Sequence, residues 1–175
     1  MTLRSLLIAP LILAAVAVAE PGQNPGQGPG QDRFTSGVWH GDANYDDEGQ
    51  FSDCTMTAEA EKGVLLGFVI SADFDWGLVI ADESRSFEVG ARKAVLLLVD
   101  GRDPIAAMAK VVDTHGILIP LENSDEVIEA MRDGKVLRIA TDGTEFSFKL
   151  TGTADAIAAL AACVTDHQGT NRVQL

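Results

Sequence analysis

The chain has 175 residues, of which 46% are hydrophobic, and its formal net charge at pH 7 is −13. A protein this acidic repels phosphate backbones and anionic lipid surfaces, which argues against nucleic acid as a partner. Its length fits one folded domain after the terminal segments are set aside.

Residues 1–19 have the three parts of a secretory signal peptide. Arg4 provides the positive charge, an apolar run follows it, and Ala17 and Ala19 occupy the −3 and −1 positions of a cleavage site. The run is shorter than the roughly 18 residues of a membrane-spanning helix, and Pro10 interrupts it. We therefore expect cleavage after Ala19 and a mature chain in the periplasm or outside the cell that does not span a membrane.

Residues 20–33 consist mostly of Pro, Gly and Gln. Because such a segment buries little apolar surface, its composition predicts a flexible linker. We expect a single β-rich domain over residues 34–166, followed by a tail over residues 167–175.

Most of this domain shows the two-residue periodicity of strands with one solvent-facing side. In the segment 39–45, Trp39 and Ala43 alternate with His40 and Asp42. Further strands are expected over residues 51–60, 64–72, 76–82, 94–100, 105–113, 116–122, 136–142 and 144–150.

The segment 94–100, with the sequence AVLLLVD, is apolar on both of its faces. That pattern predicts a central strand that is covered on both sides. In the last strand, Phe146, Phe148 and Leu150 are expected to point into the core. The Asp-Gly pairs at 100–101 and 142–143 indicate hairpin turns.

Two segments have the signals of short helices. The first opens at Asn123 with Glu126 three residues later and ends at Gly134, a pattern typical of a capping box and a glycine stop. The second covers residues 153–164, with Thr153 as the expected N-cap.

The chain contains two cysteines, Cys54 and Cys163. In an oxidising compartment such a pair is most simply one disulfide. The alternative, a catalytic thiol, would need an activating histidine or a helix N-terminus, whereas Cys163 falls late in its expected helix. We therefore expect a mainly β fold, an antiparallel β-sandwich or open barrel with two short helices and one disulfide.

The stretch DANYDDEGQFSD, residues 42–53, partly matches a calcium-binding loop. Position six of that loop requires glycine, but this chain has Asp47, and no helical pattern flanks the stretch. The stretch therefore predicts an acidic hairpin in which Gly49 adopts a positive φ. A weaker divalent-cation site remains an alternative. Its candidate ligands are Asp42, Asn44, Asp46, Asp53 and His40.

No common catalytic motif is present: the sequence lacks G-x-S-x-G, H-E-x-x-H and a phosphate-binding loop. We therefore predict no catalytic residue, no enzymatic activity and no cofactor. Phe74 and Trp76 lie beside an expected turn, where they would form either an aromatic patch for a partner or part of the core.

One family resemblance rests on the C-terminal segment 146–164, which combines a Phe-x-Leu-x-Gly strand end, a helix of small residues and a cysteine. Upstream, Cys54 and Met56 follow a tryptophan-containing strand, and Asp100 ends an apolar strand. These features resemble the invasion-associated locus B family of exported proteins from Gram-negative bacteria. The resemblance covers most of residues 37–165.

The resemblance implies a β-sandwich-like, accessory binding domain in the periplasm or secreted from a Gram-negative cell, and it carries over no catalytic residue. This chain differs in having two cysteines where typical members have more. We accordingly expect an exported, non-enzymatic domain that binds a protein or an envelope component. The alternatives are a periplasmic module for a small ligand or a divalent metal, and an inhibitor of a secreted protease.

Overall fold

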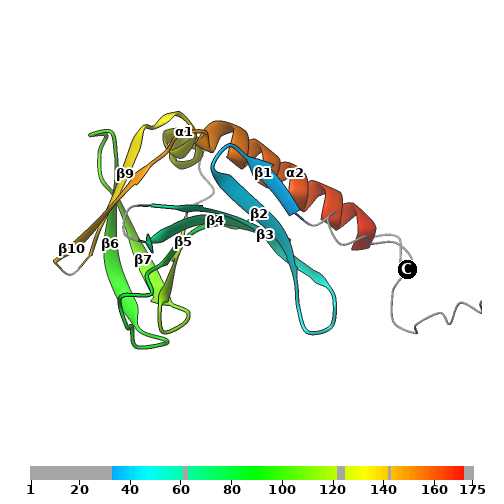
Figure 1. Cartoon of the computed structure of the whole chain (residues 1–175), viewed down its shortest axis with the longest axis horizontal. Coiled ribbons are helices and arrows are strands. Elements are labelled where there is room, and N and C mark those ends of the chain that lie inside the picture. The colour runs from blue at the N-terminus through cyan, green and yellow to red at the C-terminus, as the bar shows by residue number, and fades with distance from the viewer. Residues whose placement is uncertain (1–32, 61–62, 122–124, 142, 172–175) are drawn as a thin grey trace, which may run out of the picture.

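A computed structural model describes residues 33–60, 63–121, 125–141 and 143–171 (Figure 1). The predicted signal peptide, nearly all of the predicted linker and the helix-capping Asn123 lie outside these residues.

The described chain forms one ten-stranded antiparallel sheet and two helices (Figure 1). The strands are β1 (Arg33–Ser36), β2 (Trp39–Tyr45), β3 (Phe51–Glu59), β4 (Leu65–Ser71), β5 (Trp76–Ala81), β6 (Arg92–Val99), β7 (Ile105–Val111), β8 (Gly116–Pro120), β9 (Val136–Thr141) and β10 (Thr144–Lys149). The helices are α1 (Asp125–Asp133) and α2 (Thr153–Asn171). The predicted mainly β, antiparallel fold with two helices and one disulfide is confirmed.

The strand order in the sheet is β1-β2-β3-β4-β5-β8-β7-β6-β9-β10. The first five strands follow one another as in the sequence, whereas β6, β7 and β8 enter in reverse order. As a result, β5 pairs with β8 and β6 pairs with β9. The helix α2 packs against β1, β2, β3 and β4, and α1 packs against α2.

One face of the sheet forms the hydrophobic core together with α2. Trp39 and Phe68 are fully buried in it, with their ring centroids 5.5 Å apart in an edge-to-face arrangement. The inward positions predicted for the segment 144–150 are confirmed, because Phe146, Phe148 and Leu150 are buried. The core members from α2 are Ala156, Ile157, Leu160 and Val164.

The disulfide between Cys54 and Cys163 joins β3 to α2 and spans 109 residues of sequence. The helix is longer than the predicted segment 153–164, because it continues to Asn171, into the residues expected to form the tail. His167 accounts for part of this extension: it stacks on Phe51 with 5.3 Å between ring centroids.

The local signals at the turns are partly confirmed. Gly49 has a φ of 76°, as predicted for the β2–β3 hairpin, and Asp100 and Gly101 both have positive φ in the β6–β7 hairpin. Gly134 follows α1, as predicted. Glycine is needed there for a steric reason, because a Cβ would lie 2.6 Å from the Ala130 carbonyl oxygen. Thr153 does not cap α2 as predicted, because its Oγ1 is buried and has no hydrogen-bond partner among the described residues.

Asp100 ties the β6–β7 hairpin to the connection between α1 and β9. Its carboxylate accepts hydrogen bonds from the backbone N–H of Lys135 at 2.7 Å and of Val136 at 2.9 Å. The hydrogen bond from Lys135 is the main reason why the pKa of Asp100 lies below its ordinary value.

We expect the replacement Asp100→Asn to destabilise the fold at neutral pH, because the neutral amide accepts these hydrogen bonds less strongly. Since the pKa is lower in the folded state, the carboxylate stabilises the fold above about pH 4 and loses this effect as the pH falls further. The difference in urea midpoint between Asp100→Asn and the unmodified protein should therefore be large near pH 7 and small near pH 3. The exposed Asp103 in the same connection provides the control Asp103→Asn, and an equal difference at both pH values would contradict the prediction.

Candidate functional site

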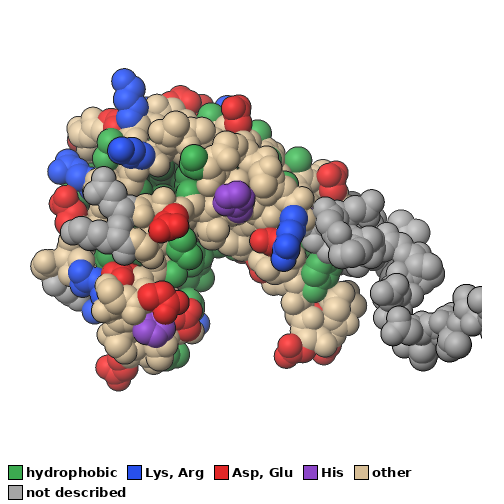
Figure 2. All heavy atoms as spheres, in the orientation of Figure 1, with side chains coloured by type: hydrophobic (Ala, Val, Ile, Leu, Met, Phe, Trp, Pro, Cys, Tyr) green, Lys and Arg blue, Asp and Glu red, His purple; other side chains and the backbone are tan. Residues whose placement is uncertain are grey.

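Three acidic residues of the stretch 42–53, Asp42, Asp46 and Asp53, each have a local structural partner. Asp42 forms an ion pair with Arg33 across β1 and β2, at 2.9 Å. The Asp46 carboxylate accepts hydrogen bonds from the backbone N–H of Glu48 and Gln50, so it stabilises the turn of the hairpin. Figure 2 shows acidic side chains at the tip of the projecting β2–β3 hairpin.

The remaining metal-site candidates are spread along one face of β2 and β3. Asn44 donates a hydrogen bond to the Asp53 carboxylate at 2.7 Å, and Asp53 also accepts one from Thr55. His40 is exposed on β2, opposite Thr57 of β3. Within the described residues, no three His, Cys, Asp or Glu side chains are grouped so that they could hold a metal ion.

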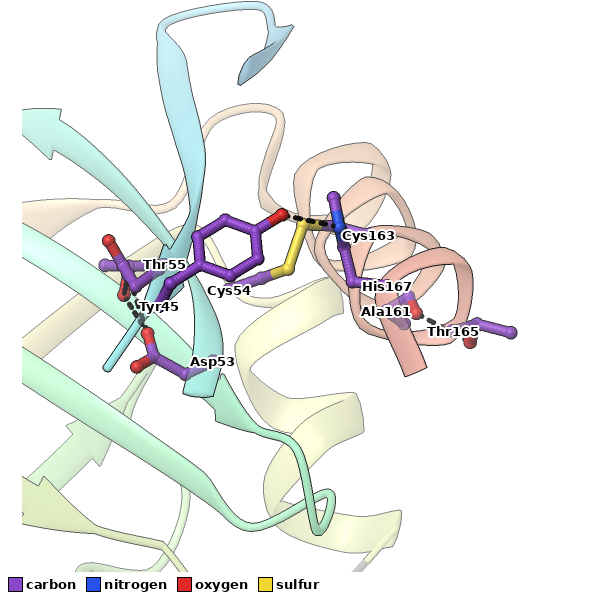
Figure 3. Close-up of a disulfide and its surroundings, with 9 residues drawn as sticks. Tyr45, Asp53, Cys54, Thr55, Ala161, Cys163, Thr165 and His167 are labelled. Carbon is purple, nitrogen blue, oxygen red and sulfur yellow. Dashed lines mark hydrogen bonds between the residues drawn. A yellow bond between two sulfur atoms is a disulfide. The ribbon is translucent and has the colours of Figure 1, made fainter. Parts of the chain in front are cut away.

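Figure 3 shows the disulfide next to the side chains of Tyr45 and His167. Tyr45 hydroxyl and His167 Nδ1 are 3.0 Å apart and form a hydrogen bond between the end of β2 and α2. Farther along α2, Gln168 donates a hydrogen bond to the Ala72 carbonyl. These contacts hold the C-terminal half of α2 against the sheet.

The two aromatic candidates for partner binding are separated by their surroundings. Phe74 is 42% exposed in the β4–β5 turn, with a φ of 64°. Trp76 is half-buried at the start of β5, where it packs against the core cluster. The structure therefore brings only Phe74 to the surface as an exposed aromatic side chain at this turn.

The strand β6 gives the main correction to the sequence analysis. It lies inside the sheet between β7 and β9, as a central strand should. However, it is not covered on both sides, because Leu96 is 45% exposed. The hydrophobic core occupies the other face, which carries Val95 and Leu97.

The uncovered face of β6 continues onto its neighbours. Leu96 lies opposite Ala106 of β7 on one side and Ala140 of β9 on the other, and Ala94 lies opposite Met108, which is also 45% exposed. These five residues form the floor of a groove of about 1130 Å³. Pro120, Leu121 and Val127 also line the groove. We call it the β6–β7 groove.

On the three strands β9, β6 and β7, this same face of the sheet carries three cations. Arg92 and Lys110 are opposite each other on β6 and β7, and Arg138 of β9 lies opposite Leu98 of β6. None of the three forms an ion pair with another described side chain. Glu145 is the acidic side chain among the described residues that line the groove.

Sequence reasoning did not identify the groove. The available signal is the doubly apolar segment 94–100, which predicts a buried strand because apolar side chains on both faces normally indicate two covering layers. The same signal is expected from a strand whose second face is free to bind another molecule.

Comparisons with known proteins show similarity in fold alone. No protein-family model matches the sequence, and no curated protein matches it. The crystal structure of invasion associated protein B from Bartonella henselae is similar, with a TM-score of 0.51 and 19% sequence identity. The match covers 77% of this chain and 97% of that protein, in agreement with the fold implied by the sequence motifs. Within the described part of the chain, neither helix has the length and apolar character that would let it cross a membrane.

Proposed function

We propose that this chain is an exported, non-enzymatic domain that binds another protein through the β6–β7 groove. The observation that carries the proposal is the uncovered apolar floor around Leu96 and Met108, each 45% exposed on strands inside the sheet. Apolar floors of this kind on stable sheets mark sites where a partner excludes water. Methionine favours such a role because its flexible, polarizable side chain adapts to different surfaces.

Export is supported by two independent features. The segment 1–19 has the pattern of a signal peptide, and the disulfide fits an oxidising compartment. A periplasmic or secreted location in a Gram-negative bacterium is therefore part of the proposal.

Among the described residues, the pKa values of the Asp82 and Asp100 carboxylates are clearly lowered. Asp82 is 4% exposed, and the hydrogen bond from the Ser84 hydroxyl is the main reason why its pKa is lowered. It also accepts a hydrogen bond from Arg85. Like Asp100, it holds a turn in place, so both shifts have a structural explanation.

The proposal predicts which surface positions lie against a partner in the cell. A photo-crosslinking amino acid placed at Leu96 or Met108 should give a discrete protein adduct, and the same amino acid at Val38 or Val89 should not. Val38 and Val89 are matched controls because both are exposed apolar residues outside the groove. Adducts are measured by mass after irradiation of cells that express the chain.

Adding a substitution to the crosslinking variant separates specific binding from chance contact. With the crosslinker at Leu96, the change Met108→Gln should reduce the adduct about tenfold, since it places an amide in the apolar floor. The change Val89→Gln should leave the adduct unaltered. Equal adducts at groove and control positions, an adduct with lipid alone, or no adduct would each contradict the proposal.

A further inference from the structure

We infer that the occupant of the β6–β7 groove is an α-helix with small apolar side chains along one face and acidic residues near both of its ends. This inference rests on the proposed function and specifies the partner of the same site. It follows from the width of the floor, the distance between the cations and the hydrogen bonding of the strands.

The width of the floor fits one helix. The floor is formed by three adjacent strands, β9, β6 and β7. Neighbouring strands are about 4.8 Å apart, so the three span about 10 Å between their outer axes, which is close to the diameter of a helix with its side chains. Because Ala94, Ala106 and Ala140 surround Leu96 on this floor, a helix backbone can approach the sheet closely.

The three cations lie beyond the apolar floor residues along the strands, and of the three only Arg92 also lines the groove. Arg92 and Lys110 form a pair at one end of the strands, and Arg138 lies opposite Leu98, six residues farther along β6. At about 3.3 Å per residue this is a distance of about 20 Å, which a helix covers with about 13 residues. Acidic side chains three to four turns apart on the helix would therefore meet both groups of cations.

Other occupants fit this surface less well. An extended peptide would leave its backbone groups unpaired, because β6 already has hydrogen-bonded neighbours on both sides. A second copy bound through the same face would bring the three cations against their equivalents, and each copy carries a net charge of −13. An acyl chain would remain largely in water, because Leu96 and Met108 lie on an open floor rather than in a closed cavity.

The test uses designed peptides and the purified full chain. The first peptide is a helix of about 16 residues with alanine and leucine on one face and glutamate at both ends. The second has lysine in place of each glutamate, and the third has the composition of the first in an order that removes the apolar face. Fluorescence anisotropy should show the first peptide binding about tenfold more tightly than either of the others.

Charge reversal in the protein provides the decisive comparison. The double variant Arg92→Glu/Arg138→Glu should weaken binding of the glutamate peptide about tenfold and improve binding of the lysine peptide. Arg132→Glu on α1 changes the net charge through an exposed residue that is not on the strands of the floor, so it should leave the preference unaltered. A melting curve checks that each variant is folded.

Two results would overturn the inference. One is equal affinity for the glutamate and lysine peptides, and the other is an equal effect of Arg132→Glu and the double variant. If position 96 still forms a specific protein adduct in cells, these results reject the acidic helix as the partner, and the groove remains the proposed binding site. If the adduct is also absent, the proposed function fails as well.

Discussion

Removing the disulfide with Cys54→Ala and Cys163→Ser should lower the free energy of unfolding by about 4 to 5 kcal/mol, the loss expected for a loop of this length. The bond spans 109 residues, and it joins the strand β3 to the helix that covers it. Alanine is chosen at the fully buried Cys54 to avoid burying a hydroxyl, and serine at the partly exposed Cys163. The measurement is a urea or guanidinium unfolding curve.

Reduction of the unmodified protein serves as the matched control, because it opens the bond without changing any side chain apart from the two thiols. The reduced protein and the double variant should have similar unfolding midpoints. A loss below about 1 kcal/mol in both cases would contradict the expected role of the bond.

The replacement Trp39→Ala should destabilise the fold by about 3 to 5 kcal/mol, as expected for a large buried aromatic side chain. Trp39 is fully buried, contacts Phe68 edge to face, and donates a hydrogen bond from Nε1 to the Thr151 carbonyl oxygen at 3.2 Å. It therefore connects β2 to the residues that precede α2. Unfolding curves in denaturant give the value.

The matched replacement Trp39→Phe keeps an aromatic ring and removes the indole N–H. Its cost should be clearly smaller than that of Trp39→Ala, with about 0.5 to 1.5 kcal/mol from the lost hydrogen bond. Equal costs for the two variants would show that the hydrogen bond to Thr151, rather than ring packing, dominates the contribution of Trp39.

The alternation of side chains along single strands was predictable from the sequence. The periodicity of β2 placed Trp39 inside and His40 outside, because successive side chains of a strand point to opposite faces. The pairing of Cys54 with Cys163 was predictable from the number of cysteines and the expected compartment. Both predictions need only local geometry or counting.

The arrangement of the strands was not predictable in the same way. Nothing local to β5 specifies that its partner is β8, which lies about 40 residues farther along the chain. The exposure of Leu96 depends on which face the helices cover, and that is a property of the tertiary structure. The same is true of Gly134, where a side chain would clash with Ala130 and Val99.

The acidic stretch shows how far spacing alone can support a site prediction. The carboxylates of Asp42, Asp46 and Asp53 have different partners: an arginine, a turn backbone and an asparagine. Extended strands keep such side chains apart along one face, so a motif-like order of residues does not bring them together.

The strand order also has a consequence for the course of folding. The pairings of β5 with β8 and of β6 with β9 join segments far apart in sequence, and α2, made last, packs on β1 to β4. Such non-local contacts slow folding because long chain loops must close before the contacts form. During synthesis, which begins at the N-terminus, the apolar face of the first strands therefore remains in water until α2 is available. In that period the chain depends on protection from aggregation.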